Sequence, residues 1–227
     1  MSAQESNLKV QVLSDLNLHV FSDTLSEDIQ EASRSSHALA VKAASDSYHP
    51  YEQNHEWFQR YVDVMGALGW VAVKTDVRNV TETGLRLELG DLFAKGLEAG
   101  AEIVSGNVRK GFQDLGLAIV EALSKPENYP LLDVRTREDD RKVISLAKCE
   151  QSAGGQVTML VSAVIDDQLP QRNGKTLFVN WKREGGAIYA CGAGFSFSRR
   201  TYARAEGAIE ARIHANALKI LADIPLA

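Results

Sequence analysis

The chain of 227 residues lacks the features that assign a sequence at once to several protein classes. It has only two cysteines, Cys149 and Cys191, too few for a disulfide framework or a four-cysteine zinc site. No apolar run approaches the roughly 18–20 residues that a membrane-spanning helix needs. The first residues do not show a basic stretch followed by an apolar one, so no secretory signal peptide is expected. We expect a cytoplasmic protein, or one exported without a cleaved signal peptide.

Catalytic and cofactor-binding motifs are scarce. The sequence contains neither the Gly-x-Ser-x-Gly elbow of serine hydrolases nor a P-loop. His55-Glu56 begins like a zinc hydrolase motif, but Gln59 occupies the position of the second histidine ligand. Gly192-Ala193-Gly194 begins like a dinucleotide-binding fingerprint, but Phe197 stands where the third glycine is required. We therefore expect no metal and no cofactor, and an enzymatic activity is not favoured.

The charge of the chain is unevenly distributed. The formal net charge is −5, and so acidic a chain is not expected to bind nucleic acid. Residues 1–64 hold four basic and ten acidic residues, whereas residues 172–204 hold seven basic residues and one acidic residue. The basic segment is either a solvated edge that faces the acidic half of the same chain or a surface for an anionic partner.

The N-terminal part of the chain is predicted to be mainly helical. Residues 1–22 are polar with scattered apolar positions, which predicts an irregular arm that can include a short strand. A helix is predicted from Asp23 or Ser26 to Ser47, where Tyr48-His49-Pro50 interrupts it. A second helix is predicted up to Gly69, because apolar residues recur at spacings of three and four. These residues are Trp57, Phe58, Tyr61, Val62, Met65 and Leu68.

Two further patterns follow before residue 125. Residues 70–77 and 85–89 alternate apolar and polar side chains, which predicts a β-hairpin. Segment 91–123 is amphipathic and rich in glycine, including Gly96 and Gly100. Each glycine inside a helix costs up to about 1 kcal/mol relative to alanine, so this helix would be metastable. It is either a core helix in close contact with its neighbours or one that leaves the body for a membrane interface or an oligomer.

The C-terminal part predicts an antiparallel sheet. Four strands are expected at about 142–149, 156–165, 175–183 and 187–198, separated by short glycine-containing turns that favour a meander. A final helix from about Arg199 to Ile224 would cover one side of this sheet. The expected class is α+β in a single domain, with a sub-division into residues 1–125 and residues 142–227.

One pair of residues is a candidate for nucleophilic chemistry. Cys191 alternates with Tyr189, Ala193 and Phe195 on a face that is expected to be buried. A cysteine nucleophile needs a nearby base, and His214 on the final helix is the candidate for that role. The alternative function is therefore an enzyme or small-molecule binder with a cleft between the sheet and the helices. Trp181 would also line that cleft.

The favoured function is non-enzymatic binding, to a membrane surface or a protein partner. Lys182, Arg183, Arg199 and Arg200 would attract anionic headgroups, and the segment that contains Gly96 and Gly100 would supply an apolar face. A sheet flanked by helices, with a metastable amphipathic segment, resembles in its layout the membrane-active bacterial toxins. That resemblance implies a virulence-related, membrane-binding role. The oligomeric state is left open by the sequence.

Overall fold

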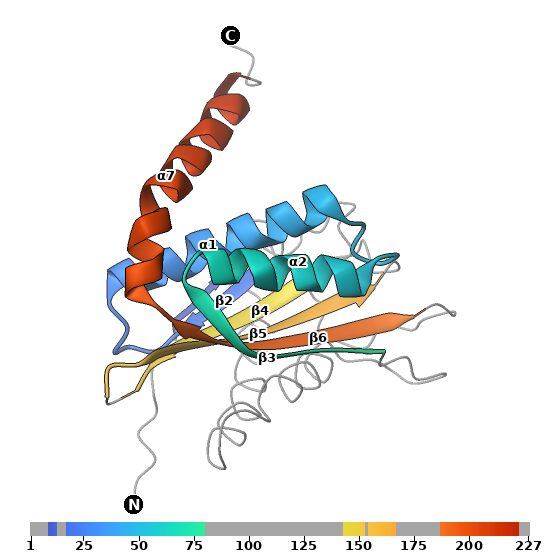
Figure 1. Ribbon diagram of the computed structural model, residues 1–227, viewed down its shortest axis with the longest axis horizontal. Coiled ribbons are helices and arrows are strands. Elements are labelled where there is room, and N and C mark those ends of the chain that lie inside the picture. The colour runs from blue at the N-terminus through green and yellow to red at the C-terminus, as the bar shows by residue number, and fades with distance from the viewer. Residues whose placement is uncertain (1–8, 13–16, 80–142, 153, 167–186, 223–227) are drawn as a thin grey trace, which may run out of the picture.

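The computed structural model describes residues 9–12, 17–79, 143–152, 154–166 and 187–222. Within them, helices α1 (Glu27–Ser47) and α2 (Asn54–Ala67) lie across one face of a six-stranded sheet (Figure 1). Helix α7 (Arg199–Ala222) rises from one end of this body. The strands are β1 (Lys9–Val12), β2 (Asn17–Phe21), β3 (Trp70–Asn79), β4 (Val143–Gln151), β5 (Val157–Asp166) and β6 (Ile188–Phe197). The predicted α+β class is confirmed.

The sheet is mixed, with the strand order β1-β2-β4-β5-β6-β3. The pair β2–β4 is parallel, and the other pairs are antiparallel. Three of the predicted C-terminal strands are present as β4, β5 and β6, whereas 175–183 lies outside the described residues. The four-stranded meander is not confirmed, because β5 pairs directly with β6 and the second edge of β6 pairs with β3.

The N-terminal part contributes more to the sheet than the sequence predicted. The arm was expected to be irregular with at most a short strand, yet it supplies both β1 and β2. Polar Asn17 and His19 interrupt the apolar pattern of β2, which hides its strand character although His19 and Val20 are fully buried. Strand β3 is present as predicted, but its expected hairpin partner, 85–89, lies outside the described residues.

The two helices that cover the sheet differ in how they pack. Helix α1 starts after Ser26 and ends at Ser47, as predicted, and it turns small side chains such as Ala40 and Ala44 inward. Helix α2 carries the predicted apolar face, of which Leu68 lies just beyond the last helical residue. Its bulky residues Trp57, Phe58, Tyr61 and Met65 are buried against the sheet. Small side chains of α1 and bulky aromatic side chains of α2 therefore form the helix side of the core.

Helix α7 does not cover the sheet, and that prediction was wrong. Its first turns pack beside α1 and α2, and the rest of the helix points away from the body (Figure 1). Of the predicted inner face, Ile209 is buried and Tyr202 and Ala205 are half-buried. The error arose because the sequence pattern of an amphipathic helix shows that one face is covered but does not identify the covering element.

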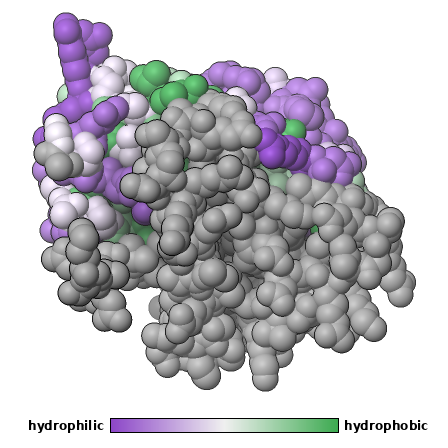
Figure 2. All heavy atoms as spheres, turned by 90° about the horizontal axis from the view of Figure 1, so that it is seen from below, coloured by the Kyte–Doolittle hydropathy of each residue, from purple (hydrophilic) through white to green (hydrophobic). Residues whose placement is uncertain are grey.

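The length of the helices and the hydropathy of the surface are both relevant to membrane binding. Over the described ranges, we find no helix that combines the length and the apolar character required to cross a bilayer. Seen from below in Figure 2, the described surface mixes hydrophilic residues with a hydrophobic patch. Among the described residues, the large exposed hydrophobic side chains are Val71 and Val73 of β3. A bulge between Ala72 and Lys74 interrupts the regular register of that strand.

Candidate functional site

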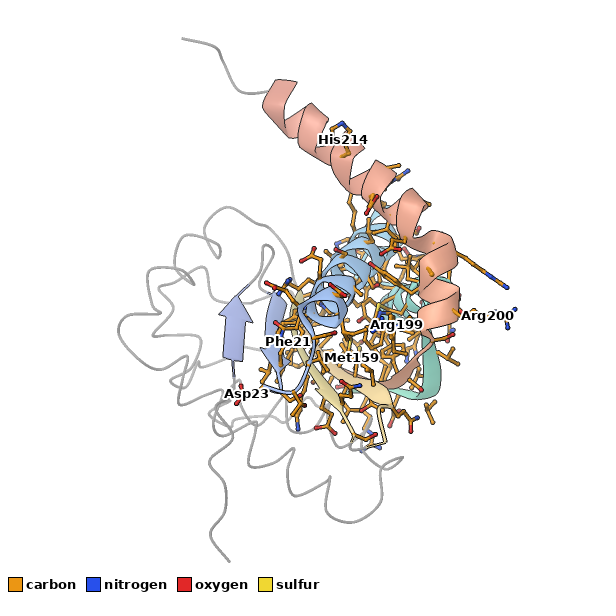
Figure 3. The ribbon with its side chains drawn as sticks, turned by 90° about the vertical axis from the view of Figure 1, so that its left-hand side faces the viewer. Phe21, Asp23, Met159, Arg199, Arg200 and His214 are labelled. Carbon is orange, nitrogen blue, oxygen red and sulfur yellow. The ribbon has the colours of Figure 1, made fainter. Side chains whose placement is uncertain are left out.

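The structure does not bring the predicted catalytic pair together. Cys191 is fully buried in β6 beneath α2, and burial raises the pKa of its thiol far above the ordinary range. His214 is exposed on the projecting part of α7, far from the core residues Met159 and Phe21 (Figure 3). A thiol without access to solvent or a base is not available as a nucleophile. Tyr189 is half-buried beside Tyr51, and Trp181 lies outside the described residues.

The predicted binding residues divide into two groups. Arg199 and Arg200 are exposed in the first turn of α7 (Figure 3), and the sequence position of Arg204, which is also exposed, lies one turn later. Lys182, Arg183, Gly96 and Gly100 lie outside the described residues. The basic character predicted for this region is therefore located, within the described chain, at the base of the projecting helix.

The base of α7 is firmly attached to the body. Ser198, which precedes the helix, donates its backbone N–H to the carbonyl oxygen of Gly69 at 2.7 Å. Trp70, Phe197 and Tyr202 form a row of ring contacts with centroid distances of 4.5 and 5.5 Å, which links β3, β6 and α7. Gly69 has a φ of +90°, and a side chain there would meet the Ser198 carbonyl and the Tyr202 backbone. The N-terminal end of α7 is thus fixed to the body, while its C-terminal end projects away from the body.

A groove of about 370 Å³ lies where α1, α2 and α7 meet. Most of its lining is apolar, contributed by Leu39 on α1, Val64 and Leu68 near the end of α2, and Ala205 and Ile209 on α7. Lys42 and Asp46, which form an ion pair at 3.0 Å along α1, also line it. Its volume and lining fall within the range of sites that bind small apolar ligands.

A shallow polar hollow lies on the exposed side of α2. Tyr48, His55, Glu56, Gln59 and Arg60 are among the residues that line it. The described residues do not include a group of three or more histidine, cysteine, aspartate or glutamate side chains arranged to hold a metal ion. The hollow therefore offers hydrogen-bonding groups without the converging ligands of a metal site.

A buried polar cluster that was not predicted from the sequence lies between α1, α2 and the sheet. His37 on α1 has its Nδ1 at 2.8 Å from the Tyr61 hydroxyl and its Nε2 at 2.8 Å from Ser145 Oγ. His19 on β2 meets the His37 ring edge to face. A serine, a histidine and a tyrosine in series resemble a proton relay, but these residues are at most 1% exposed, so substrate has no access to them. A signal was available, because His37 falls at helical spacing with the buried Ala40, Val41 and Ala44.

Among known proteins, the chain shows distant structural similarity to a virulence factor. No protein-family model matches the chain. A search of characterised protein sequences also gave no match. Among solved structures, the chain is similar to the Evf virulence factor, at 15% sequence identity over 86% of this chain and 74% of that one, with a TM-score of 0.29. At so low a TM-score the two backbones do not superpose as one fold, and the similarity carries no argument about function.

Proposed function

We propose that the protein is a non-enzymatic binding protein that docks reversibly on an anionic membrane surface through helix α7. The observation that carries this proposal is the combination of a helix that projects from the body with three arginines exposed at its base. A projecting helix can meet a flat surface without hindrance from the rest of the molecule. Its arginines then lie where they can reach phosphate headgroups.

The position of these arginines supports a role in binding rather than in stability. Arg199 and Arg200 occupy the first turn of α7, which contains no acidic residue. The N-terminal end of a helix carries a partial positive charge, so cations there are unfavourable by several tenths of a kcal/mol, about 0.3–1 for each. An anionic partner would relieve that repulsion.

The expected affinity is modest and depends on salt. A basic residue near an anionic membrane contributes about 1 kcal/mol, so Arg199, Arg200 and Arg204 together would give weak, reversible docking. Beyond the arginines, the sequence of α7 continues the apolar spacing through Ile213, Ala217 and Ile220. An amphipathic helix of this kind strengthens docking when its apolar face enters the headgroup region.

The test is co-sedimentation of the full chain with vesicles of phosphatidylcholine, with and without phosphatidylserine, at low and high salt. We expect binding to the anionic vesicles only, and loss of that binding in high salt because the charges are exposed. The double substitution Arg199→Gln with Arg200→Gln should weaken binding by about 10- to 30-fold, which corresponds to about 1 kcal/mol for each charge.

A matched control removes two exposed charges elsewhere. Lys42 and Arg60 lie on α1 and α2, and the pair Lys42→Gln with Arg60→Gln changes the net charge by the same amount. We expect this control to bind nearly as well as the unaltered chain. Equal weakening by both double substitutions, or equal binding to neutral vesicles, would reject docking through α7.

The groove between α1, α2 and α7 favours one alternative, the binding of a small apolar ligand. The cleft predicted between the sheet and the helices is filled, over the described residues, by Trp57, Tyr61 and Phe195. The groove is instead lined from the outside of both helices. Failure of vesicle binding, together with uptake of an apolar fluorescent probe that Ala208→Trp abolishes, would support this alternative.

A further inference from the structure

Two histidines are buried where helix α1 meets the sheet. His19 on β2 and His37 on α1 are fully buried, with ring centroids 4.8 Å apart. His37 also reaches Tyr61 on α2 and Ser145 on β4, so this one side chain connects three elements. Because β2 pairs in parallel with β4, the two histidines join α1 to two adjacent strands of the sheet.

We propose that His19 and His37 form an acid-sensitive latch that holds helix α1 on strands β2 and β4 at neutral pH and releases it as the pH falls. In its neutral form, His37 donates to one hydroxyl and accepts from the other, so both of its hydrogen bonds are made. Protonation would leave hydroxyl acceptors on both sides but would place a positive charge in a fully buried site, with the second imidazole 4.8 Å away. A second imidazolium at His19 would add like-charge repulsion.

Among the described residues, charged and titratable groups face the two histidines from several neighbouring elements. On α1, the positive Arg34 acts on His19 and is itself bound to Glu31 at 2.7 Å. On α2, Tyr61 is the titratable contact, and burial raises its pKa, so it stays neutral. On β4, Cys149 shares this face with Ser145, and burial raises the pKa of the Cys149 thiol to about 12. Neither ring nitrogen of His19 has a hydrogen-bond partner among the described residues.

The direction of the pH effect follows from the pKa values of the two histidines. Burial lowers the pKa of His37 to about 3. Burial, followed by the neighbouring His37 and Arg34, lowers the pKa of His19 well below its usual value. The open state, in which a histidine has a pKa of about 6.5, therefore takes up protons that the closed state does not accept. The two histidines stabilise the closed state fully above about pH 6.5. As the pH falls below that value, the equilibrium constant for opening rises by up to about 100-fold per pH unit, because two groups take up protons.

The experiment is urea unfolding of the full chain between pH 7.5 and 5 at constant ionic strength, followed by tryptophan fluorescence. For the unaltered chain we expect the unfolding constant to rise about 250-fold between pH 6.5 and 5, since each histidine contributes about 16-fold over this range. The double variant His19→Leu with His37→Gln should lose most of this rise. Keeping the pH above 5 excludes Glu31, whose lowered pKa affects stability only below its unfolded value of 4.5.

Exposed histidines provide the matched control. His49→Gln with His55→Gln also removes two imidazoles, but from the surface, and should leave the pH dependence unchanged. The proposal is overturned if the control and the latch variant behave alike, or if the latch variant keeps the full pH dependence.

A measurement on the unaltered chain covers the case in which the latch variant does not fold. Proton uptake on unfolding, measured between pH 6 and 5, should approach two. An uptake below one would reject the latch. Amide exchange at pH 5, corrected for its intrinsic pH dependence, should show that α1 opens before β5 and β6, and opening in the reverse order would also reject it.

Discussion

Beneath α1 and α2 the sheet buries aromatic rings and two imidazoles, whereas α7 leaves most of its described side chains in solvent. The two regions also differ in charge. Helices α1 and α2 together carry six acidic and three basic residues, while Arg199–His214 of α7 carries four arginines and two glutamates. The acidic layer belongs to the packed body, and the basic helix stands beside it (Figure 1).

This difference separates the part of the molecule that stabilises the fold from the part suited to binding. Substitutions beneath α1 and α2 should act through stability, because each buried side chain there touches several others. Substitutions on the exposed side of α7 should act through binding, with small effects on stability. Each of the following changes tests that division.

The largest loss of stability is expected from Trp57→Ala. Trp57 is 1% exposed, stacks on Tyr61 and donates its indole N–H to Ser45 Oγ at 3.1 Å. Its removal should lower the free energy of unfolding by about 3–5 kcal/mol, as expected for loss of a large buried aromatic side chain. Urea denaturation measures the change. Val71→Ala, at a side chain that is 53% exposed, should stay within about 0.5 kcal/mol. Similar losses of unfolding free energy for Trp57→Ala and Val71→Ala would contradict the packing described between α2 and the sheet.

The next effect concerns the junction between the two regions. A methyl group at Gly69 would lie 2.9 Å from the Ser198 carbonyl oxygen and from the Tyr202 backbone nitrogen, on a residue whose φ is +90°. Gly69→Ala should therefore destabilise the protein by about 2 kcal/mol, from left-handed backbone strain together with the steric conflict. The measurement is again urea denaturation.

The nearby Gly66 is the control for that change. It lies in α2, and a Cβ there would have no neighbour within 4 Å. Gly66→Ala should be neutral or stabilising by up to about 1 kcal/mol, because alanine favours the helix. If Gly69→Ala were equally harmless, α7 would not be attached as the contacts at its base indicate.

The sequence predicts well where individual helices and strands lie in the chain. It predicts poorly which elements pack against or pair with one another. The limits of α1 follow from Ser26 and from the proline at position 50, and the apolar face of α2 follows from spacing alone. Strands β4, β5 and β6 lie close to their predicted positions. Pairing between β6 and β3 joins residues more than 100 positions apart, and local patterns contain no information about it.

The functional residues show the same limit. The exposure of Arg199 and Arg200 agrees with the expectation that charged residues stay in solvent, whereas the separation of Cys191 from His214 could not be deduced. The sequence placed α7 over the sheet because its spacing shows a buried stripe. Only the structure reveals that this stripe meets α1 and α2 near its start and that the helix then departs. His19 was overlooked because a buried histidine on a strand looks like a polar interruption.

The smallest effect should come from Gly207→Ala, and it tests whether α7 unfolds with the body or independently of it. Gly207 is exposed inside α7, and a Cβ there would have no neighbour within 4 Å. Alanine should stabilise the helix by about 0.5–1 kcal/mol. Amide exchange of residues from Glu210 onward should then slow by up to about 5-fold, while the urea midpoint of the body barely moves. If the midpoint instead rises by the full amount, α7 belongs to the cooperative core, and a membrane surface that engages it would have to act on the whole fold.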